Sequence, residues 1–170
     1  IEAVQNNYNQ GKIGKSELNF LEKIISNSIQ IINLENIEIN PKKNVIVISA
    51  DYQSSLLAEA ASASFHTDGW HVFSLGDMSS AIDVLFDLDL QKFVAKIWKS
   101  RIGIMIIVVF SSTEDGLKFF AESVNSIKSK FRRNLYLALC GDIKKNTVIK
   151  ADLMGENLET TLQWSQTTFE

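Results

Sequence analysis

The stretch that decides the fold is "HTDGWHVFSLGD", residues 66–77, where a helix ends and a strand begins. Gly69 stands where a helix needs a C-terminal residue with positive φ. The segment "WHVFSL" (70–75) is predicted to be a short strand that stops at Leu75-Gly76. The preceding segment, "QSSLLAEAASASFHTDG" (53–69), is rich in Ala and Ser and is predicted to be a helix. A helix that turns directly into a strand is the repeating step of an α/β protein.

Further strands are predicted on both sides of this corner. They are "NVIVISA" (44–50), "IGIMIIVVF" (102–110), "LYLALC" (135–140) and a short fifth strand within "TVIKADLM" (147–154). Strands that read as continuous apolar runs and alternate with helices indicate a parallel sheet that is covered on both faces. We therefore predict an α/β fold of the flavodoxin-like, doubly wound type, with a five-stranded parallel sheet.

Helical patterns fill the rest of the chain. Apolar residues at steps of three and four predict one N-terminal helix of about five turns, with Ser16 as its N-cap, after a shorter helix and a turn. Later helices are expected within 77–100, capped by Ser79 or Ser80, within 113–131 and within 157–166. The only proline, Pro41, marks a linker. The predicted division is a helical cap segment (1–34), a linker (35–43) and the flavodoxin-type domain (44–170).

The composition of the chain limits the classes of partner and the cellular compartment that we expect. A net charge of -3 over 170 residues argues against nucleic-acid binding, and the basic run Lys128–Arg133 is interpreted as a solvated helix end. The longest apolar run has nine residues, short of the ~20 that a membrane helix needs. One cysteine, Cys140, excludes an internal disulfide, and the sequence does not open with a signal peptide. We expect a cytoplasmic protein with no membrane contact.

In doubly wound sheets, ligands bind beyond the carboxyl ends of the strands. The loop after the first strand, "ADYQSS" (50–55), has no glycine, so it does not match a Rossmann or P-loop phosphate site. A phosphoacceptor receiver domain needs an acidic pair after that strand and an aspartate after the third strand. Only Asp51 follows the first strand, and the third ends in Phe110-Ser111-Ser112. These classes are therefore disfavoured.

The sequence contains few candidate residues for metal binding or catalysis. Two histidines, His66 and His71, and the single Cys140 do not make a zinc site by spacing, and no Ser-His-Asp set can be argued. We therefore predict no metal site and no enzymatic activity. One histidine would suffice as an axial ligand to haem. Four aspartates gather at the ligand-binding edge and are either an acidic site or helix N-caps: Asp51, Asp77, Asp115 and Asp142.

The order of these pieces resembles a known family, the cobalamin-binding domain with a helical cap found in methionine synthase, corrinoid methyltransferase proteins and cobalamin-dependent light regulators. The segment Gly69-Trp70-His71-Val72 with Leu75-Gly76 resembles the family's corner between the first helix and the second strand. Tyr8-Asn9-Gln10-Gly11 resembles the Trp-x-x-Gly turn of the cap, and Ala151-Asp152 to Leu158 resembles the approach to the closing helix. The resemblance implies that Ser111, Thr113 and Gly141 line the slot for the nucleotide tail of cobalamin. It thereby implies candidate cofactor-binding residues at Tyr8, Ser54, Gly76, Ser111, Thr113 and Gly141.

Several positions depart from the family pattern. The family's lower-ligand motif, Asp-x-His-x-x-Gly, should follow the first strand. Counting back from Leu75-Gly76 places its histidine near Ser54, and a leucine replaces the glycine. The Glu-His pair in the cap of the light regulators is Leu18-Asn19 here, and the glycine pair after the fourth strand is Cys140-Gly141. Cobalt would thus lack protein nitrogen ligands on both faces.

The family resemblance, taken together with the missing ligand residues, suggests three hypotheses for the function. The leading hypothesis is a regulatory or sensory module, of the kind found in bacterial regulators, that acts in signalling or transcriptional control through contacts with a protein partner and without a firm cofactor. The second is a sensor that binds a tetrapyrrole, either base-on cobalamin or haem held by His66, His71 or Cys140. The third is a corrinoid-dependent methyl carrier or mutase subunit.

Overall fold

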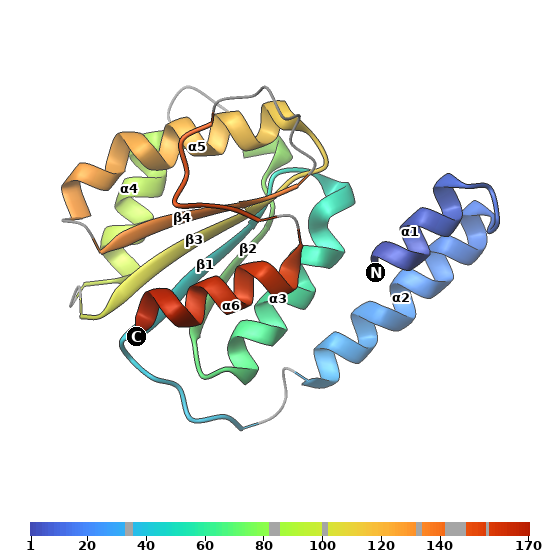
Figure 1. Ribbon diagram of the computed structural model, residues 1–170, viewed down its shortest axis with the longest axis horizontal. Coiled ribbons are helices and arrows are strands. Elements are labelled where there is room, and N and C mark those ends of the chain that lie inside the picture. The colour runs from blue at the N-terminus through green and yellow to red at the C-terminus, as the bar shows by residue number, and fades with distance from the viewer. Residues whose placement is uncertain (33–35, 82–85, 100–101, 132–133, 142–148, 156) are drawn as a thin grey trace.

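The computed structural model describes residues 1–32, 36–81, 86–99, 102–131, 134–141, 149–155 and 157–170 (Figure 1). These residues form a parallel sheet in the order β2-β1-β3-β4-β5. The strands are β1 (Lys43–Ser49), β2 (His71–Asp77), β3 (Ile104–Phe110), β4 (Leu135–Cys140) and β5 (Leu153–Gly155). The predicted five-stranded, doubly wound α/β fold is confirmed.

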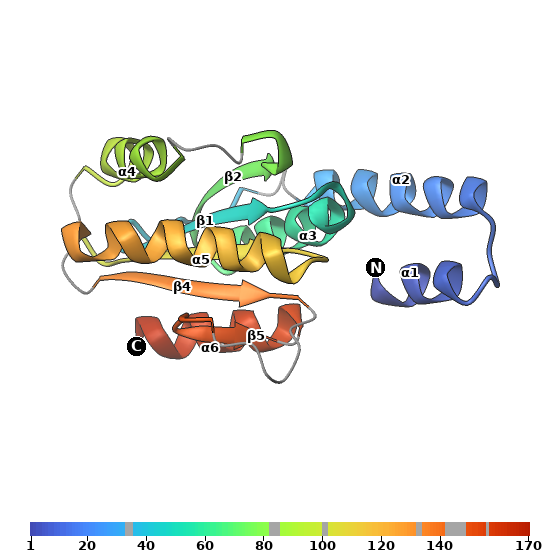
Figure 2. The same cartoon turned by 90° about the horizontal axis from the view of Figure 1, so that it is seen from above.

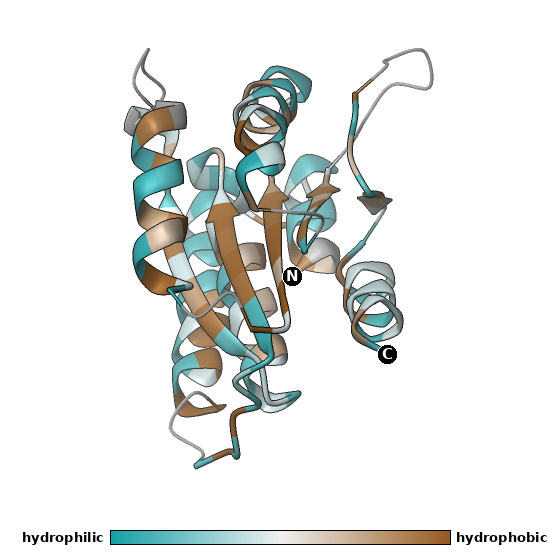
Figure 3. Cartoon of the chain, turned by 90° about the vertical axis from the view of Figure 1, so that its left-hand side faces the viewer, coloured by the Kyte–Doolittle hydropathy of each residue, from teal (hydrophilic) through white to brown (hydrophobic). Residues whose placement is uncertain are grey.

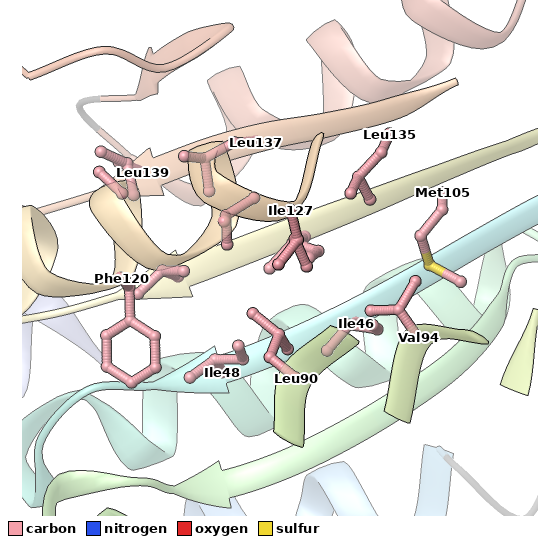
Figure 4. Packing of buried hydrophobic residues seen from close by; sticks show 14 of the residues in the cluster. Ile46, Ile48, Leu90, Val94, Met105, Phe120, Ile127, Leu135, Leu137 and Leu139 are labelled. Atoms are coloured by element: carbon pink, nitrogen blue, oxygen red, sulfur yellow. The ribbon is translucent and has the colours of Figure 1, made fainter. Parts of the chain in front are cut away.

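Helices cover both faces of the sheet (Figures 1 and 2). On one face lie α4 (Phe86–Ile97) and α5 (Glu114–Lys128), and on the other α3 (Ser55–Thr67) and α6 (Leu158–Phe169). Alternate residues of each strand point to opposite faces. In β1, Ile46 and Ile48 therefore pack under α4 and α5, as Figure 4 shows, while Val45 and Val47 face α3 and α6. The strands β1, β3 and β4 are accordingly mostly hydrophobic (Figure 3), which matches the continuous apolar runs of the sequence, whereas β2 at the edge of the sheet is more polar.

The corner between α3 and β2 forms as expected. Gly69 has φ of 76°, and the backbone N–H of Trp70 donates to the carbonyl of Phe65. Trp70 is fully buried, with its ring edge-on to Phe65 and Phe169, and the ammonium of Lys43 lies 5.7 Å from its centroid. The corner thus ties the first β-α-β unit to the end of α6.

A helical hairpin of α1 (Glu2–Asn9) and α2 (Lys15–Ile32) projects from the α/β body (Figures 1 and 2). It packs on α3, where the Ser26 hydroxyl donates to the Glu59 carboxylate over 2.9 Å. The prediction of Ser16 as N-cap is wrong, because α2 already begins at Lys15. The Glu17 carboxylate instead accepts from the N–H of Gly14 at 2.8 Å, as in a capping box.

One further expectation needs correction. Ser79 and Ser80 do not cap α4, since they lie in a short 3₁₀ helix, Ser79–Ala81, and residues 82–85 lie outside the described residues. The short fifth strand expected within 147–154 is confirmed as β5 (Leu153–Gly155), which extends one residue past that segment, whose residues 147 and 148 lie outside the described residues. Within the described ranges, no helix is long and apolar enough to span a membrane.

Candidate functional site

The carboxylate of Asp51 links the ends of β1 and β3 at the carboxyl edge of the sheet. One of its oxygens accepts from the backbone N–H and the hydroxyl of Ser54, each at 2.9 Å. The other accepts from the hydroxyl of Ser111 at 2.8 Å and from the N–H of Ser112 at 2.7 Å. Asp51 therefore supplies the negative charge that a bound anion would bring to this edge.

These contacts change the acidity of Asp51. Partial burial by itself raises the pKa of the carboxyl, but the hydrogen bonds from Ser112, Ser111 and Ser54 outweigh it and hold the pKa below its ordinary value. The group is thus ionised at neutral pH and fully engaged with protein donors. It is a structural bridge and not a free acid or base.

The loops after β3 and β4 lie in direct contact at Gly141. A Cβ added to Gly141 would stand 2.2 Å from the carbonyl oxygen of Ser111 and 3.1 Å from the side chain of Leu117. The N–H of Ser111 donates to the carbonyl of Cys140 at 3.1 Å, which holds the two strand ends together. The space between Ser111 and Gly141 therefore does not admit even a methyl group.

A second close contact lies on the α6 side of the sheet. The sulfur of Cys140, at the end of β4, lies 2.9 Å from the hydroxyl of Thr161 in α6. Burial raises the pKa of Cys140 to about 11, although the hydrogen bond to Thr161 acts in the opposite direction. Cys140 is a buried thiol that fills space between sheet and helix, as expected for a cysteine at the end of an apolar strand.

The structure gathers part of the predicted site. Ser54 and Ser111 are joined through Asp51, Thr113 follows Ser111 as the N-cap of α5, and Gly141 touches Ser111. Gly76 lies on the neighbouring strand, where it is exposed and pairs with Ile48.

Tyr8 lies apart, in α1 of the hairpin, and is 37% exposed. A 3.4 Å hydrogen bond from the Gln5 side chain to the carbonyl of Gln53 links that helix to the sheet edge.

Asp51 was expected at this edge, either in an acidic site or as a helix N-cap, and it does cap the short 3₁₀ helix Tyr52–Ser54. Thr161 was not predicted. Thr161 leaves no comparable signal, because its partner Cys140 lies 21 residues away.

The histidines lie far from this edge in the topology. His71 begins β2, where it is exposed and packs against the ring of Phe73 at 4.4 Å, and His66 lies in the last turn of α3. Both are at the amino end of the parallel strands, opposite to Asp51. Among the described residues, no group of three His, Cys, Asp or Glu is placed to hold a metal ion.

Comparison with known proteins bears on the fold. No protein-family model matches the sequence, and no curated protein shows a significant match. Among solved structures, the monomethylamine corrinoid protein of Methanosarcina barkeri superposes with a TM-score of 0.68 at 16% identity, covering 98% of this chain and 77% of that one. The chain has a cobalamin-binding-like fold. At this identity the similarity concerns the fold alone.

The residues of this cobalamin-binding-like domain do not fit a cofactor ligated by histidine with its tail in the slot. Counted from Asp51, the motif's histidine position is Gln53, one residue before Ser54, and Gln53 is exposed. Gly141 and Ser111, which the resemblance assigned to the tail slot, are in contact with each other. The domain thus keeps the scaffold without the motif histidine, and two of the residues that the resemblance assigned to the tail slot touch each other.

Proposed function

We propose that this cobalamin-binding-like domain is a regulatory or sensory module that acts in signalling or transcriptional control through protein contacts, without histidine-ligated cobalamin. The observation that carries the proposal is the bridge from Asp51 to Ser111 and Ser112, together with the contact of Gly141 on Ser111. If the ligand-binding edge is held together by the protein's own groups, the domain would act by binding a protein partner through its outer surface. The proposal assigns no catalytic reaction to the chain.

A tetrapyrrole sensor is the second candidate. It is favoured by the fold shared with a corrinoid protein and by two aromatic side chains that reach solvent, Tyr52 (78% exposed) directly after β1 and Tyr8 (37%) in α1. Such rings could stack on a flat macrocycle that lies over the carboxyl edge without entering the sheet. Base-on cobalamin needs no protein histidine, so this binding mode would tolerate the closed slot.

An absorbance experiment separates the two candidates. The purified chain is incubated with hydroxocobalamin or with hemin, desalted, and scanned across the visible range. The leading proposal predicts a colourless protein with both cofactors. Retained colour with a shifted band would overturn it and support the tetrapyrrole sensor, and His66→Ala, His71→Ala and Cys140→Ser would then test each side chain as a ligand.

A matched pair of variants tests whether the missing histidine or the contact between Gly141 and Ser111 prevents cobalamin binding. Gln53→His restores the histidine of the family motif, and Gln53→His with Leu56→Gly restores its glycine as well. Both are expected to remain colourless, because the contact between Gly141 and Ser111 is unchanged. Tight cobalamin binding by the double variant would mean that the missing ligand, and not the closed slot, had abolished binding.

A further inference from the structure

Ile102 stands exposed at the amino ends of the strands, the edge of the sheet opposite to the candidate site. It lies two residues before β3 and is 51% exposed. Its carbonyl accepts from the indole Nε1–H of the buried Trp98 at 3.0 Å, and the side-chain amide of Asn134 donates to the carbonyl of the next residue, Gly103, at 3.2 Å. Gly103 has φ of 72° and packs so closely on Lys42 that an added Cβ would collide with the Lys42 backbone. Ile102 is therefore held in place, and little conformational freedom remains to be lost when a partner covers it.

Exposed lysines lie around this isoleucine, where α4 and α5 both end (Figures 1 and 2). We call the set the amino-edge surface: Ile102, Lys42, Lys96, Lys99 and Lys130. Two of the lysines lie within two residues of Trp98, and a third contacts Gly103 through its backbone. The fourth, Lys130, follows α5, and the ring of the next residue, Phe131, stacks on Trp98 with 6.4 Å between centroids. The ammonium of Lys130 also donates to the side chain of Gln91 in α4 at 2.6 Å. These contacts bring lysines from three separate segments to one place.

Charge of the opposite sign lies at another corner of the same edge. The carbonyl of Glu38 lies 3.0 Å from the position of a Cβ added to Gly69, and Asp68 directly precedes that glycine. The chain as a whole carries a net charge of -3, so its composition does not account for this concentration of lysines. The negative end of a helix favours cations, which explains lysines at the ends of α4 and α5 but neither Lys42 nor the exposed Ile102 among them. The amino-edge surface is therefore a positively charged patch with a fixed apolar centre.

We propose that the amino-edge surface binds an acidic segment of a protein partner, with one apolar side chain of that segment packed on Ile102. This rests on the proposed function, because it names the surface and the chemistry of the partner for action through protein contacts. Lysines at the rim of an interface speed association and select a partner of opposite charge, while a central apolar residue supplies an anchor. A nucleic acid fits less well, because the five residues of this surface include no aromatic ring on which bases could stack. A membrane also fits less well, because one isoleucine offers far less apolar area than the face of an interfacial helix.

Fluorescence anisotropy with two labelled probe peptides tests the proposal on the whole chain. Both peptides consist of aspartate and glutamate residues around one central residue, which is leucine in the first peptide and serine in the second. We expect the leucine peptide to bind with a Kd between about 10 μM and about 1 mM at about 0.1 M salt. Lys99→Glu with Lys130→Glu should weaken this binding by at least about tenfold. The matched control is Lys15→Glu with Lys23→Glu, which makes the same change of charge at two exposed lysines of α2 and should bind within about twofold of the wild type.

The apolar anchor is tested with the same two peptides. Ile102→Ser should weaken binding of the leucine peptide by at least about fivefold and binding of the serine peptide by less than about twofold, because only leucine packs on Ile102. Leu88→Ser changes another side chain that is 51% exposed, on α4, and should affect neither peptide. Circular dichroism confirms that each variant is folded.

Four results would overturn the proposal. They are no binding of the leucine peptide at about 1 mM, an equal loss with both lysine pairs, an equal loss of both peptides with Ile102→Ser, and tighter binding of a short DNA duplex or of phosphatidylcholine vesicles with about one third phosphatidylserine. The last result would assign the surface to a nucleic acid or to a membrane. These readouts need no cofactor, so they can fail while the absorbance result stands, and the reverse.

Discussion

The carboxylate of Asp51, just after β1, accepts a 2.7 Å hydrogen bond from the backbone N–H of Ser112, just after β3. The two residues are 61 positions apart in the sequence and meet because β1 and β3 are paired with Ser49 opposite Phe110. Four donors converge on this one side chain. The carboxyl edge of the sheet is therefore organised around an internal anion.

Asp51→Asn should destabilise the fold by about 1–3 kcal/mol at neutral pH, because an amide presents only one oxygen to donors that now meet a carboxylate. The loss should shrink in acid. The folded pKa of Asp51 lies below its ordinary value, so its contribution is fully present above the unfolded pKa near 4 and disappears as pH falls through the folded pKa. Urea unfolding at neutral pH and at about pH 3 measures both effects.

The control for Asp51 is Asp89→Asn. Asp89 lies on α4, 71% exposed in its side chain, in an i,i+3 pair with Lys92. Its replacement should change the free energy of unfolding by less than about 0.5 kcal/mol. A loss for Asp51→Asn that stays constant from neutral pH to acid would show that charge is not what the bridge requires.

Gly141→Ala tests the closed contact between the β3 and β4 loops. The new methyl group would meet the Ser111 carbonyl, so one loop must move, at a cost of about 1–3 kcal/mol or more. Gly76→Ala is the comparison, since Gly76 has φ of 65° but open space around its Cβ position. It should cost only the ~1–2 kcal/mol of a left-handed backbone. If Gly141→Ala were as stable as the wild type, the two loops would be separable and the slot could open.

The thiol of Cys140 should react slowly with a thiol reagent in the folded state. The thiolate is the reacting form, and a pKa of about 11 leaves very little of it at pH 8. Colorimetric thiol titration at that pH should be at least about 100-fold slower for the native protein than in denaturant. Equal rates in the two conditions would mean that α6 leaves β4 readily.

Thr161→Val should destabilise the protein by about 1–2 kcal/mol, because the sulfur of Cys140 loses its hydrogen-bond partner in a buried site. Thr161→Ser keeps the hydroxyl and should retain most of the stability. Thermal unfolding of the two variants side by side gives the difference. Indistinguishable midpoints would place the effect in packing and not in the hydrogen bond.

Asp152 should matter more than its position outside regular structure suggests. Its carboxylate accepts from the N–H of Leu137 at 2.7 Å and pairs with the ammonium of Lys128. Asp152→Ala leaves the strand N–H without its acceptor and should cost about 1–3 kcal/mol, while Lys128→Met should cost less than about 1 kcal/mol. Hydrogen exchange at the Leu137 amide, faster in the first variant only, is the measurement. Matching acceleration in both variants would make the ion pair the dominant contact.

Much of the fold could be predicted because its signals are local. Apolar runs at 44–50, 102–110 and 135–140 became β1, β3 and β4 with ends shifted by at most two residues. Gly69 marked the corner, because the residue that ends a helix often needs a positive φ, which glycine adopts without strain. Boundaries failed where competing local groups decide them, as when Gly14 with Glu17 and not Ser16 began α2.

The sequence by itself thus determined the fold class of this protein, a parallel sheet covered on both faces with a helical hairpin. It could do so because the hydrophobic pattern of each local segment indicates whether that segment is a buried strand or an amphipathic helix. Tertiary structure alone decided what the carboxyl edge contains. Asp51 meets Ser111 and Cys140 meets Thr161 only after the strands have paired and α6 has packed. Such contacts depend on register and packing over tens of residues. An edge that the sequence suggested as a ligand site therefore carries, in three dimensions, hydrogen bonds that join Asp51 to the loops after β1 and β3.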